Sequence, residues 1–521
     1  MMRNIFNLVL VLLLFFAVFP FQATPQCSSR FTIGYHNCVL NSNQDIKCFG
    51  RGHYGALGHG DNSTKGNDPN ELADYLPLVN IPEDISAVYA AGEHSCLISS
   101  TLNVKCWGYN QFGQLGIGSS DDKGDEPNEL GVYLPNIDFG LESFEMVVGM
   151  SVGRRHSCVK LSSGKIRCWG RSVYGELGYG DSLNRGDGPN EMSDYLPEVN
   201  LGSGLQASQI KLSQYSSCAL MEGGEMKCWG RNHFGQCGLG NTSSIGYLPN
   251  QMSDYLPPIN FPSGVNIASI DTGYNHHGAI SIIGDLYLWG RNENGGLGLG
   301  HANHIGDSGN EMGEYLQSTN LGNGRTIIAF GGGVYHTCAL LDGFDVKCFG
   351  SNTNSQLGYG DISTRGNSAS EMGNYLLEVN LGSGLTAQSL HIGYYHSCVV
   401  LNDNSFKCWG YNNYGQLGKG HTTNVGGNVN EMGDYLGPIN LGTGVEVTLC
   451  FDYSPTSQPS FTPTTTHSPS FTFSPSLSPT SFLQPSCFSR FSFGYFITIL
   501  TSDFKVFFLV FLSCLIFKNV F

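Results

Sequence analysis

Short runs of alternating apolar and polar residues, separated by glycine-rich turns, recur along the chain about every sixty residues. In one unit this pattern predicts a strand that begins at Ser157, a turn over 162–164 and a returning strand over 165–170. A further turn over 174–180 and a polar loop over 181–189 follow. Each unit therefore predicts about four short strands and one long loop.

One tripeptide marks the returning strand of every unit. Its copies are Cys48-Phe49-Gly50, Cys106-Trp107-Gly108, Cys168-Trp169-Gly170, Cys228-Trp229-Gly230, Leu288-Trp289-Gly290, Cys348-Phe349-Gly350 and Cys408-Trp409-Gly410. Seven copies of a four-stranded unit predict an all-β fold, a seven-bladed β-propeller over residues 27–450 with about 60 residues in each blade. We expect residues 445–450 to add a strand to the first blade and close the ring.

Six units carry two cysteines ten residues apart, and the fifth unit carries neither. The pairs are Cys38/Cys48, Cys96/Cys106, Cys158/Cys168, Cys218/Cys228, Cys338/Cys348 and Cys398/Cys408. Gly278 and Leu288 replace both partners together, as expected for a bonded pair. A hairpin can place such residues at disulfide distance, whereas the alternative, zinc, normally needs four ligands with CxxC-type spacing. We predict six disulfides, and a seventh, Cys27–Cys450, at the seam of the ring.

Features at both ends of the chain and in its loops predict export. Residues 1–24 have a basic start and an apolar stretch, which predicts a signal peptide, with an uncleaved membrane anchor as the alternative. Asn62 and Asn241 each begin an N-glycosylation sequon. Residues 454–486, rich in Ser, Thr and Pro, predict a stalk, and 487–521 predict a hydrophobic anchor or a lipid-anchor signal. We expect a secreted or cell-surface protein tethered through its C-terminus.

The overall charge argues against one class of partner. The net charge of −16, with only 26 lysines and arginines, is unsuited to nucleic acid, because phosphate contacts need clustered basic residues. No Ser-His-Asp or Cys-His arrangement lies outside the repeat pattern, so we expect neither enzyme activity nor a cofactor. Cys237 takes the place of Leu177 and Leu417 in other units, which predicts a buried, unreactive thiol.

The long loop of each unit contains acidic residues and a tyrosine. Residues 190–197 predict a helical turn with Asn190 as its N-cap and Pro197 at its end. The carboxylates Asp181, Asp187, Glu191 and Asp194 recur as Asp61, Asp68, Glu71 and Asp74. They favour a capped, solvated loop and no metal site, with calcium binding as the alternative. The loop tyrosines are Tyr75, Tyr133, Tyr195, Tyr255, Tyr315, Tyr375 and Tyr435, which we expect to anchor the loop to its blade.

Two further residue types recur at fixed positions. The five tryptophans, with Phe49 and Phe349 in the other two units, predict packing between neighbouring blades rather than a ligand cage. Histidines precede the first cysteine position by two residues at His36, His94, His156, His276, His336 and His396, and Ser216 takes the seventh place. One such residue in each blade indicates hydrogen-bonded structural groups rather than a metal site.

These motifs resemble the repeat of the regulator of chromosome condensation family. The resemblance rests on His-Ser-Cys, Val-Lys-Cys-Trp-Gly and Asn-x-[Tyr/Phe]-Gly-Gln-Leu-Gly, as in residues 109–116 and 411–418. It implies a seven-bladed propeller. It also implies protein binding or, in the founding member, guanine-nucleotide exchange on a small GTPase and contact with chromatin. The paired cysteines, the export signal and the acidic balance depart from that founding member.

We predict an exported, monomeric interaction module that binds a macromolecular partner through the loops of the propeller. The partner is expected to be a protein. Guanine-nucleotide exchange is the first alternative, from the family resemblance. A glycan-binding lectin is the second, and its expected mark is a set of exposed aromatic side chains beside carboxylates.

Overall fold

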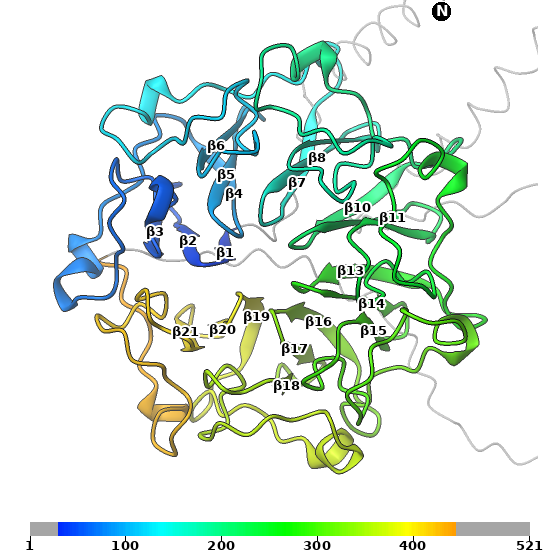
Figure 1. The fold of residues 1–521 in the computed structure, drawn as a ribbon. Helices are drawn as coiled ribbons and strands as arrows, with labels where there is room; N and C mark the ends of the chain where they lie inside the picture. Colours follow the sequence, from blue (N-terminus) through cyan, green and yellow to red (C-terminus); the bar gives the residue numbers. More distant parts are fainter. Residues whose placement is uncertain (1–29, 444–521) are drawn as a thin grey trace, which may run out of the picture. The chain divides into compact units, whose positions relative to one another are not determined.

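The structure, a computed structural model, describes residues 30–443 as seven three-stranded antiparallel sheets arranged in a ring (Figure 1). The strands are β1 (Phe31–Ile33), β2 (His36–Leu40), β3 (Ile46–Gly50), β4 (Ile85–Ala90), β5 (His94–Ser99), β6 (Val104–Gly108), β7 (Val147–Val152), β8 (His156–Leu161), β9 (Ile166–Gly170), β10 (Ala207–Leu212), β11 (Ser216–Met221), β12 (Met226–Gly230), β13 (Ile267–Thr272), β14 (His276–Ser281), β15 (Leu286–Gly290), β16 (Ile327–Gly332), β17 (His336–Leu341), β18 (Val346–Gly350), β19 (Ala387–Ile392), β20 (His396–Leu401) and β21 (Phe406–Gly410). The all-β, seven-bladed propeller predicted from the repeats is confirmed.

Short 3-10 turns are the helical elements of the described residues. They are η2 (His53–Gly55), η3 (Pro69–Glu71), η4 (Ala73–Tyr75), η5 (Gly131–Tyr133), η6 (Ser193–Tyr195), η7 (Ser253–Tyr255), η8 (Gly313–Tyr315), η9 (Ala369–Glu371), η10 (Gly373–Tyr375) and η11 (Gly433–Tyr435). Nowhere between residues 30 and 443 is there a helix with the length and apolar character that a membrane span requires.

Each blade has three strands rather than the predicted four. The first strand of every sheet lies nearest the centre of the ring, and the second and third form a hairpin outside it (Figure 1). In place of a fourth strand, the chain returns to the outer edge as a single bridge, for example between Gly50 and Lys65. The same bridge recurs in all seven blades. Glycine-rich turns on both sides leave that segment too short for a longer ladder.

The hairpin register places the cysteines directly opposite each other, as in the pair Cys38↔Cys48. All six pairs are disulfide-bonded, with Cα–Cα distances of 4.0–4.2 Å. The fifth blade pairs Gly278 with Leu288 at the same place. A Cβ on Gly278 would lie 2.4 Å from the Leu288 side chain and 2.8 Å from the Phe330 ring. Leu288 and Phe330 therefore fill the space that a disulfide occupies elsewhere.

Tryptophans join successive blades. All five are fully buried, and each indole Nε1–H donates to a backbone carbonyl of the preceding blade at 2.9–3.1 Å, as Trp229 does to Glu176. Burial of such a large side chain stabilises the blade interface by several kcal/mol, about 3–5 judged by truncation to alanine. The structure therefore confirms that the tryptophans pack between neighbouring blades.

The repeat histidines form a closed ring of hydrogen bonds, one for each blade interface. His36 Nε2 lies 2.6 Å from Ser95 Oγ, whose hydroxyl donates to the Ala56 carbonyl, so the serine accepts from the imidazole. The other links are His94–Ser157, His156–Ser217, His277–Ser216, His276–Thr337, His336–Ser397 and His396–Asn37, at 2.8–3.2 Å. Where Ser216 replaces the histidine in blade four, His277 of blade five supplies the imidazole.

The first and last blades meet directly within the described residues. Asn37 accepts from His396 and donates to the Gln416 carbonyl at 2.6 Å. The Phe31 and Phe406 rings stack at 5.5 Å. The predicted closing strand over 445–450 and the predicted Cys27–Cys450 disulfide lie outside residues 30–443. So do the signal peptide, the stalk and the C-terminal anchor, which all remain predictions.

Candidate functional site

One end of the ring carries the most distinctive set of side chains. Because His36 pairs with Gly50, the residue before each hairpin histidine and the residue after each tripeptide lie at the same end of the blade. We define the arginine–tyrosine face as the side chains gathered there: Tyr35, Arg51, Glu93, Tyr109, Phe112, Arg154, Arg155, Arg171, Tyr174, Tyr215, Arg231, Phe234, Tyr274, Arg291, Tyr335, Tyr394, Tyr395, Tyr411 and Tyr414. The hairpin turns lie at the opposite end.

Arginines and aromatic rings alternate on this face. The guanidinium of Arg171 lies 4.6 Å from the centre of the Tyr215 ring, and that of Arg291 lies 4.6 Å from the Tyr335 ring and 4.7 Å from the Phe234 ring. Arg51, Arg155 and Arg231 make equivalent contacts at 5.1–5.6 Å. Each such contact contributes about 0.5–2 kcal/mol and holds the long side chain in place.

A buried glutamate holds three of the arginines. Glu93 is 7% exposed and lies 3.3 Å from Arg51, 3.4 Å from Arg155 and 3.9 Å from Arg154. Arg154 also donates to the Tyr274 hydroxyl at 2.9 Å, near the centre of the ring. One carboxylate thus orders three guanidinium groups, which reduces the entropy that a binding partner would have to remove from them.

The face carries excess positive charge although the chain is acidic. Among residues 30–443, its six arginines pair with three carboxylates, those of Glu93, Glu176 and Glu293, which leaves three positive charges. Arg231 forms no ion pair with any described residue; its Nε donates to His233 at 3.1 Å. The chain as a whole has a net charge of −16. This local excess creates a positive potential suited to a negatively charged partner.

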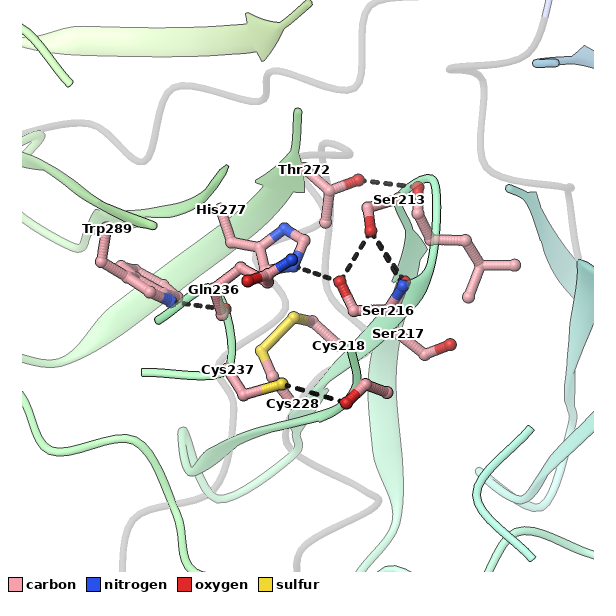
Figure 2. The surroundings of a disulfide bond; sticks show 12 residues. Ser213, Ser216, Ser217, Cys218, Cys228, Gln236, Cys237, Thr272, His277 and Trp289 are labelled. Atoms are coloured by element: carbon pink, nitrogen blue, oxygen red, sulfur yellow. Dashed lines mark hydrogen bonds between the residues drawn. A yellow bond between two sulfur atoms is a disulfide. The ribbon is translucent and has the colours of Figure 1, made fainter. Parts of the chain in front are cut away.

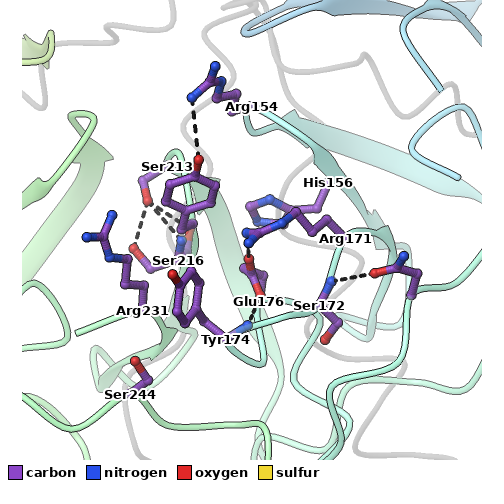
Figure 3. Close-up of polar contacts among 12 residues, drawn as sticks. Arg154, His156, Arg171, Ser172, Tyr174, Glu176, Ser213, Ser216, Arg231 and Ser244 are labelled. Atoms are coloured by element: carbon purple, nitrogen blue, oxygen red, sulfur yellow. Dashed lines mark hydrogen bonds and ion pairs between the residues drawn. The ribbon is translucent and has the colours of Figure 1, made fainter. Parts of the chain in front are cut away.

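Glu176 is the carboxylate most perturbed by burial. Burial raises its pKa to about 7, although Arg171 at 2.5 Å opposes the rise (Figure 3). Glu176 also accepts from the Tyr174 backbone N–H at 2.6 Å. Gln236 accepts the same backbone bond in another blade, so the position has a structural role that an amide fulfils equally well.

A buried serine–histidine pair has no catalytic geometry. Ser216 Oγ lies 2.8 Å from His277 Nε2 and 2.7 Å from Ser213 Oγ (Figure 2). The serine is 1% exposed, so no substrate reaches it. Burial lowers the pKa of His277 to about 3, which makes the imidazole a poor general base. The nearby Cys237 is fully buried, and burial raises the pKa of its thiol, as its place in the repeat predicts.

The acidic loop residues bind their own backbone. Glu191 accepts from the backbone N–H groups of Gly186 and Gly188 at 2.9 and 2.8 Å, and the equivalent residue does so in every blade. Asn190 does not cap the turn as predicted: it has φ of 62°, and η6 begins only after Met192, without a side-chain cap. Among residues 30–443, no three His, Cys, Asp or Glu side chains are grouped to hold a metal ion.

The loop tyrosines lie at the outer edge of the ring, and the predicted anchoring role is wrong for them. All seven are exposed, at 62–76% of their surface. The leucine that follows each one is buried instead, as Leu196 shows at 1%, and attaches the loop to the blade. The sequon residues Asn62 and Asn241 are also exposed, and their glycosylation remains a prediction.

Reasoning from the repeats did not find the arginine–tyrosine face. Its residues differ from blade to blade: the position before the hairpin histidine is Tyr35, Glu93 and Arg155 in the first three blades. A search for identical residues passes over such positions. The available signal was that five of the six arginines directly follow or precede a repeat motif.

Comparison with known proteins agrees with this architecture. Two family models, both described as regulator of chromosome condensation (RCC1) repeat, match residues 104–159 and 224–280, and residues 147–176, 207–236 and 389–416. The ultraviolet-B receptor UVR8 of Arabidopsis thaliana is 27% identical over 65% of this chain and 68% of its own length. The probable E3 ubiquitin-protein ligase HERC6 of Homo sapiens is 29% identical over 52% of this chain, but only 24% of its own length.

Solved structures show the same fold. Prp20p from Saccharomyces cerevisiae, in a study of its binding to Gsp1p and histones, superposes with a TM-score of 0.58 at 19% identity, over 81% of this chain and 88% of that one. Human WBSCR16 superposes with a TM-score of 0.52 at 16% identity, over 71% and 86%. At these identities the likeness concerns the fold.

Proposed function

Because this chain belongs to the RCC1-repeat family, we propose that it is an exported, non-enzymatic module that binds an acidic protein partner through the arginine–tyrosine face. RCC1-repeat propellers bind other proteins, as the binding of Prp20p to Gsp1p illustrates. The observation that carries the proposal for this chain is the uncompensated positive charge on an ordered aromatic face. Arginine and tyrosine are also the residue types that dominate binding energy in protein interfaces.

The blade-to-blade variation of the face supports a single asymmetric partner. Blade one presents Tyr35 and Arg51, blade two presents Glu93 and Tyr109, and blade six presents Tyr335 without an arginine. A partner that contacts the equivalent position of all seven blades in the same way would need the same residue in each blade. A surface with different residues in each blade fits one partner in one orientation, at 1:1 stoichiometry with a monomeric propeller.

Export is supported by the chemistry of the blades. The six disulfides are all buried at blade interfaces, where they belong to the folded core. Disulfides of this kind persist in oxidising compartments and are rare in the cytosol. We therefore place the partner outside the cell, with the chain tethered at the surface through its C-terminal segment.

Guanine-nucleotide exchange on a cytosolic GTPase has less support. It would require a face exposed to the cytosol, where these hairpins would have to fold with twelve reduced thiols. Glu176, the carboxylate next to the face whose pKa burial raises, is engaged in a structural ion pair with Arg171. For these reasons we favour binding without catalysis.

A pair of charge reversals tests the proposal. Arg231→Glu alters the face, and Lys165→Glu makes the same change of charge at the opposite end, in the hairpin turn of blade three. Wild type and both variants, each made in a secretory host, are immobilised and exposed to extracellular material from the producing cells. We expect wild type and the lysine variant to retain the same acidic protein, with about tenfold weaker retention by the arginine variant.

Salt provides the second arm of the test. Retention should also fall when salt is raised to about 0.5 M, because the contact is electrostatic and partly exposed. Equal retention by all three proteins, or loss with Lys165→Glu alone, would overturn the assignment of the face. Thermal melting of each variant confirms that it is folded before the comparison is made.

A further inference from the structure

The exposed tyrosines at the outer edge of the ring form a second, independent surface. Tyrosine occupies this position in all seven blades, while the residue before it is Asp, Val, Glu or Asn. The buried tryptophan position is less constant, since phenylalanine replaces tryptophan in two blades. Burial cannot account for a side chain that is 62–76% exposed in every copy. An identical exposed ring in each blade indicates a contact made outside the molecule.

Two of these tyrosines line hollows in the surface. Tyr195 lines one of about 410 Å³, together with Asn184, Arg185, Asp187, Asn190 and Glu191. Tyr315 lines another of about 290 Å³, whose polar lining includes Asn260, Ser308 and Asn310. Asn190 and Asn310 occupy the same repeat position, five residues before their tyrosines. Both volumes lie near the lower end of the range for small-ligand sites, about 300–1,000 Å³.

Two polar groups of the first hollow are available to a ligand. Neither the Tyr195 hydroxyl nor the Asn190 side-chain amide forms a hydrogen bond with another described residue. Asn190 has φ of 62°, a left-handed conformation that asparagine tolerates better than most residues do. The lining therefore combines an exposed aromatic ring with a free amide and carboxylates that are already ordered by the loop.

This combination suits a sugar better than a peptide or an anion. The face of a tyrosine ring is electron-rich and attracts the C–H groups on one face of a pyranose. Amide and carboxylate oxygens accept from sugar hydroxyls, and amide N–H groups donate to them. The first hollow is lined mainly by polar and charged side chains, with Leu183 as its one aliphatic residue, and its carboxylates Asp187 and Glu191 outnumber its one cation, Arg185, which disfavours an anionic glycan. The second hollow adds apolar lining from Leu239, Pro257, Pro258 and Met312, against which the C–H face of a sugar packs.

The number of copies indicates a repetitive ligand. Each tyrosine is the last residue of an η turn, and Figure 1 shows these turns at the perimeter of the ring, projecting outward. Sites of low affinity gain overall affinity when one ligand engages several of them, typically by 10²–10⁴-fold. We propose that the tyrosine-lined rim hollows bind units of a neutral polysaccharide, with Tyr rings stacked on the sugar and asparagine amides hydrogen-bonded to its hydroxyl groups.

Graded substitution tests this inference. Wild type and variants with two, four or all seven rim tyrosines changed to alanine are incubated with insoluble cellulose, chitin, mannan and starch, and with immobilised heparin as an anionic control. Because the rings are exposed, every variant should keep its melting temperature. We expect wild type to bind at least one neutral polysaccharide, and the apparent affinity to fall stepwise by about 100-fold or more across the series.

Matched phenylalanine variants separate stacking from general disruption. Replacement of the same tyrosines by phenylalanine keeps the ring, so these proteins should bind within about threefold of wild type. Three results would overturn the inference: no binding of wild type to any neutral polysaccharide in the panel, binding to heparin alone, or binding that the seven alanines leave unchanged. None of them bears on the arginine–tyrosine face, which lies on other residues.

Discussion

Acidification is expected to unfold the propeller through its ring of buried histidines. Burial lowers the pKa to about 3 for His36, His94, His156, His277, His336 and His396, and to about 4 for His276. In the unfolded chain these groups titrate near about 6.5. Between about pH 6.5 and pH 3, protons therefore bind the unfolded chain and not the folded one. Stability is complete above this window and is lost as the pH falls through it.

The loss of stability on acidification is large because seven buried histidines contribute to it. At pH 5, about 1.5 units below the unfolded pKa, each histidine shifts the balance by about 2 kcal/mol toward the unfolded chain. Seven times about 2 kcal/mol is about 14 kcal/mol, which is comparable to the whole stability of a typical domain, about 5–15 kcal/mol. We therefore expect the ring to unfold near about pH 5.

Urea denaturation between about pH 8 and pH 5 measures this effect. The free energy of unfolding should be flat above about pH 7 and fall steeply below 6.5. His336→Gln keeps a donor for Ser397 but removes one titrating group, so its slope should be shallower by about 1.4 kcal/mol per pH unit. The exposed His421→Gln serves as the control for replacing a histidine outside the ring. A stability that is constant down to pH 5, or an unchanged slope in the His336 variant, would refute the reasoning.

Three further changes test the packing of the blades. Gly278→Cys with Leu288→Cys should form a seventh blade disulfide once Phe330→Ile frees the space beside the pair, since residues 278 and 288 are directly opposite each other and Ile270 occupies the position of Phe330 in another blade; non-reducing peptide mapping would detect it, and a free thiol at both positions would contradict the pairing. Trp229→Phe should lower the free energy of unfolding by about 1–3 kcal/mol through loss of the bond to Glu176 and of packing, and a melt indistinguishable from wild type would count against it. Glu191→Ala should leave the melting temperature nearly unchanged but speed proteolysis in its loop, which loses two backbone partners; mass spectrometry of early cleavage products checks the site.

The repeats explain how much of the fold could be predicted from the sequence. Seven copies of one hairpin allow each position to be compared with six others in the same chain. This comparison shows that the fifth unit lacks both cysteines of the pair and has Gly278 and Leu288 in their places. The sequence does not show that the fourth strand is reduced to a single bridge, as at Lys65. That reduction depends on how the flanking turns pack against the outer edge of the blade. The histidine partners lie in the next blade, some sixty residues away, as with His36 and Ser95.

The rim tyrosines and the arginine–tyrosine face show two different limits of comparing the repeat units within one sequence. The sequence reveals the rim tyrosines as a repeat but predicts that they anchor the loop to its blade, because tyrosine is usually half-buried. In the structure the buried anchor is the next residue, as Leu196 shows. The arginine–tyrosine face was missed because its residues vary between blades, and because a net charge of −16 hides a local positive excess. Only the ring geometry brings Arg51 and Arg155 to one glutamate, Glu93.

Site-specific photocrosslinking tests the central claim most directly. A photoreactive amino acid replaces Phe234 on the arginine–tyrosine face or, in a matched protein, Ile283, which is 69% exposed in the hairpin turn at the opposite end. Both are incubated with extracellular material and irradiated. The account predicts an adduct with one acidic protein at position 234, abolished by Arg231→Glu, and none at position 283. An adduct at 283 alone, or one at 234 that survives the charge reversal, would contradict it.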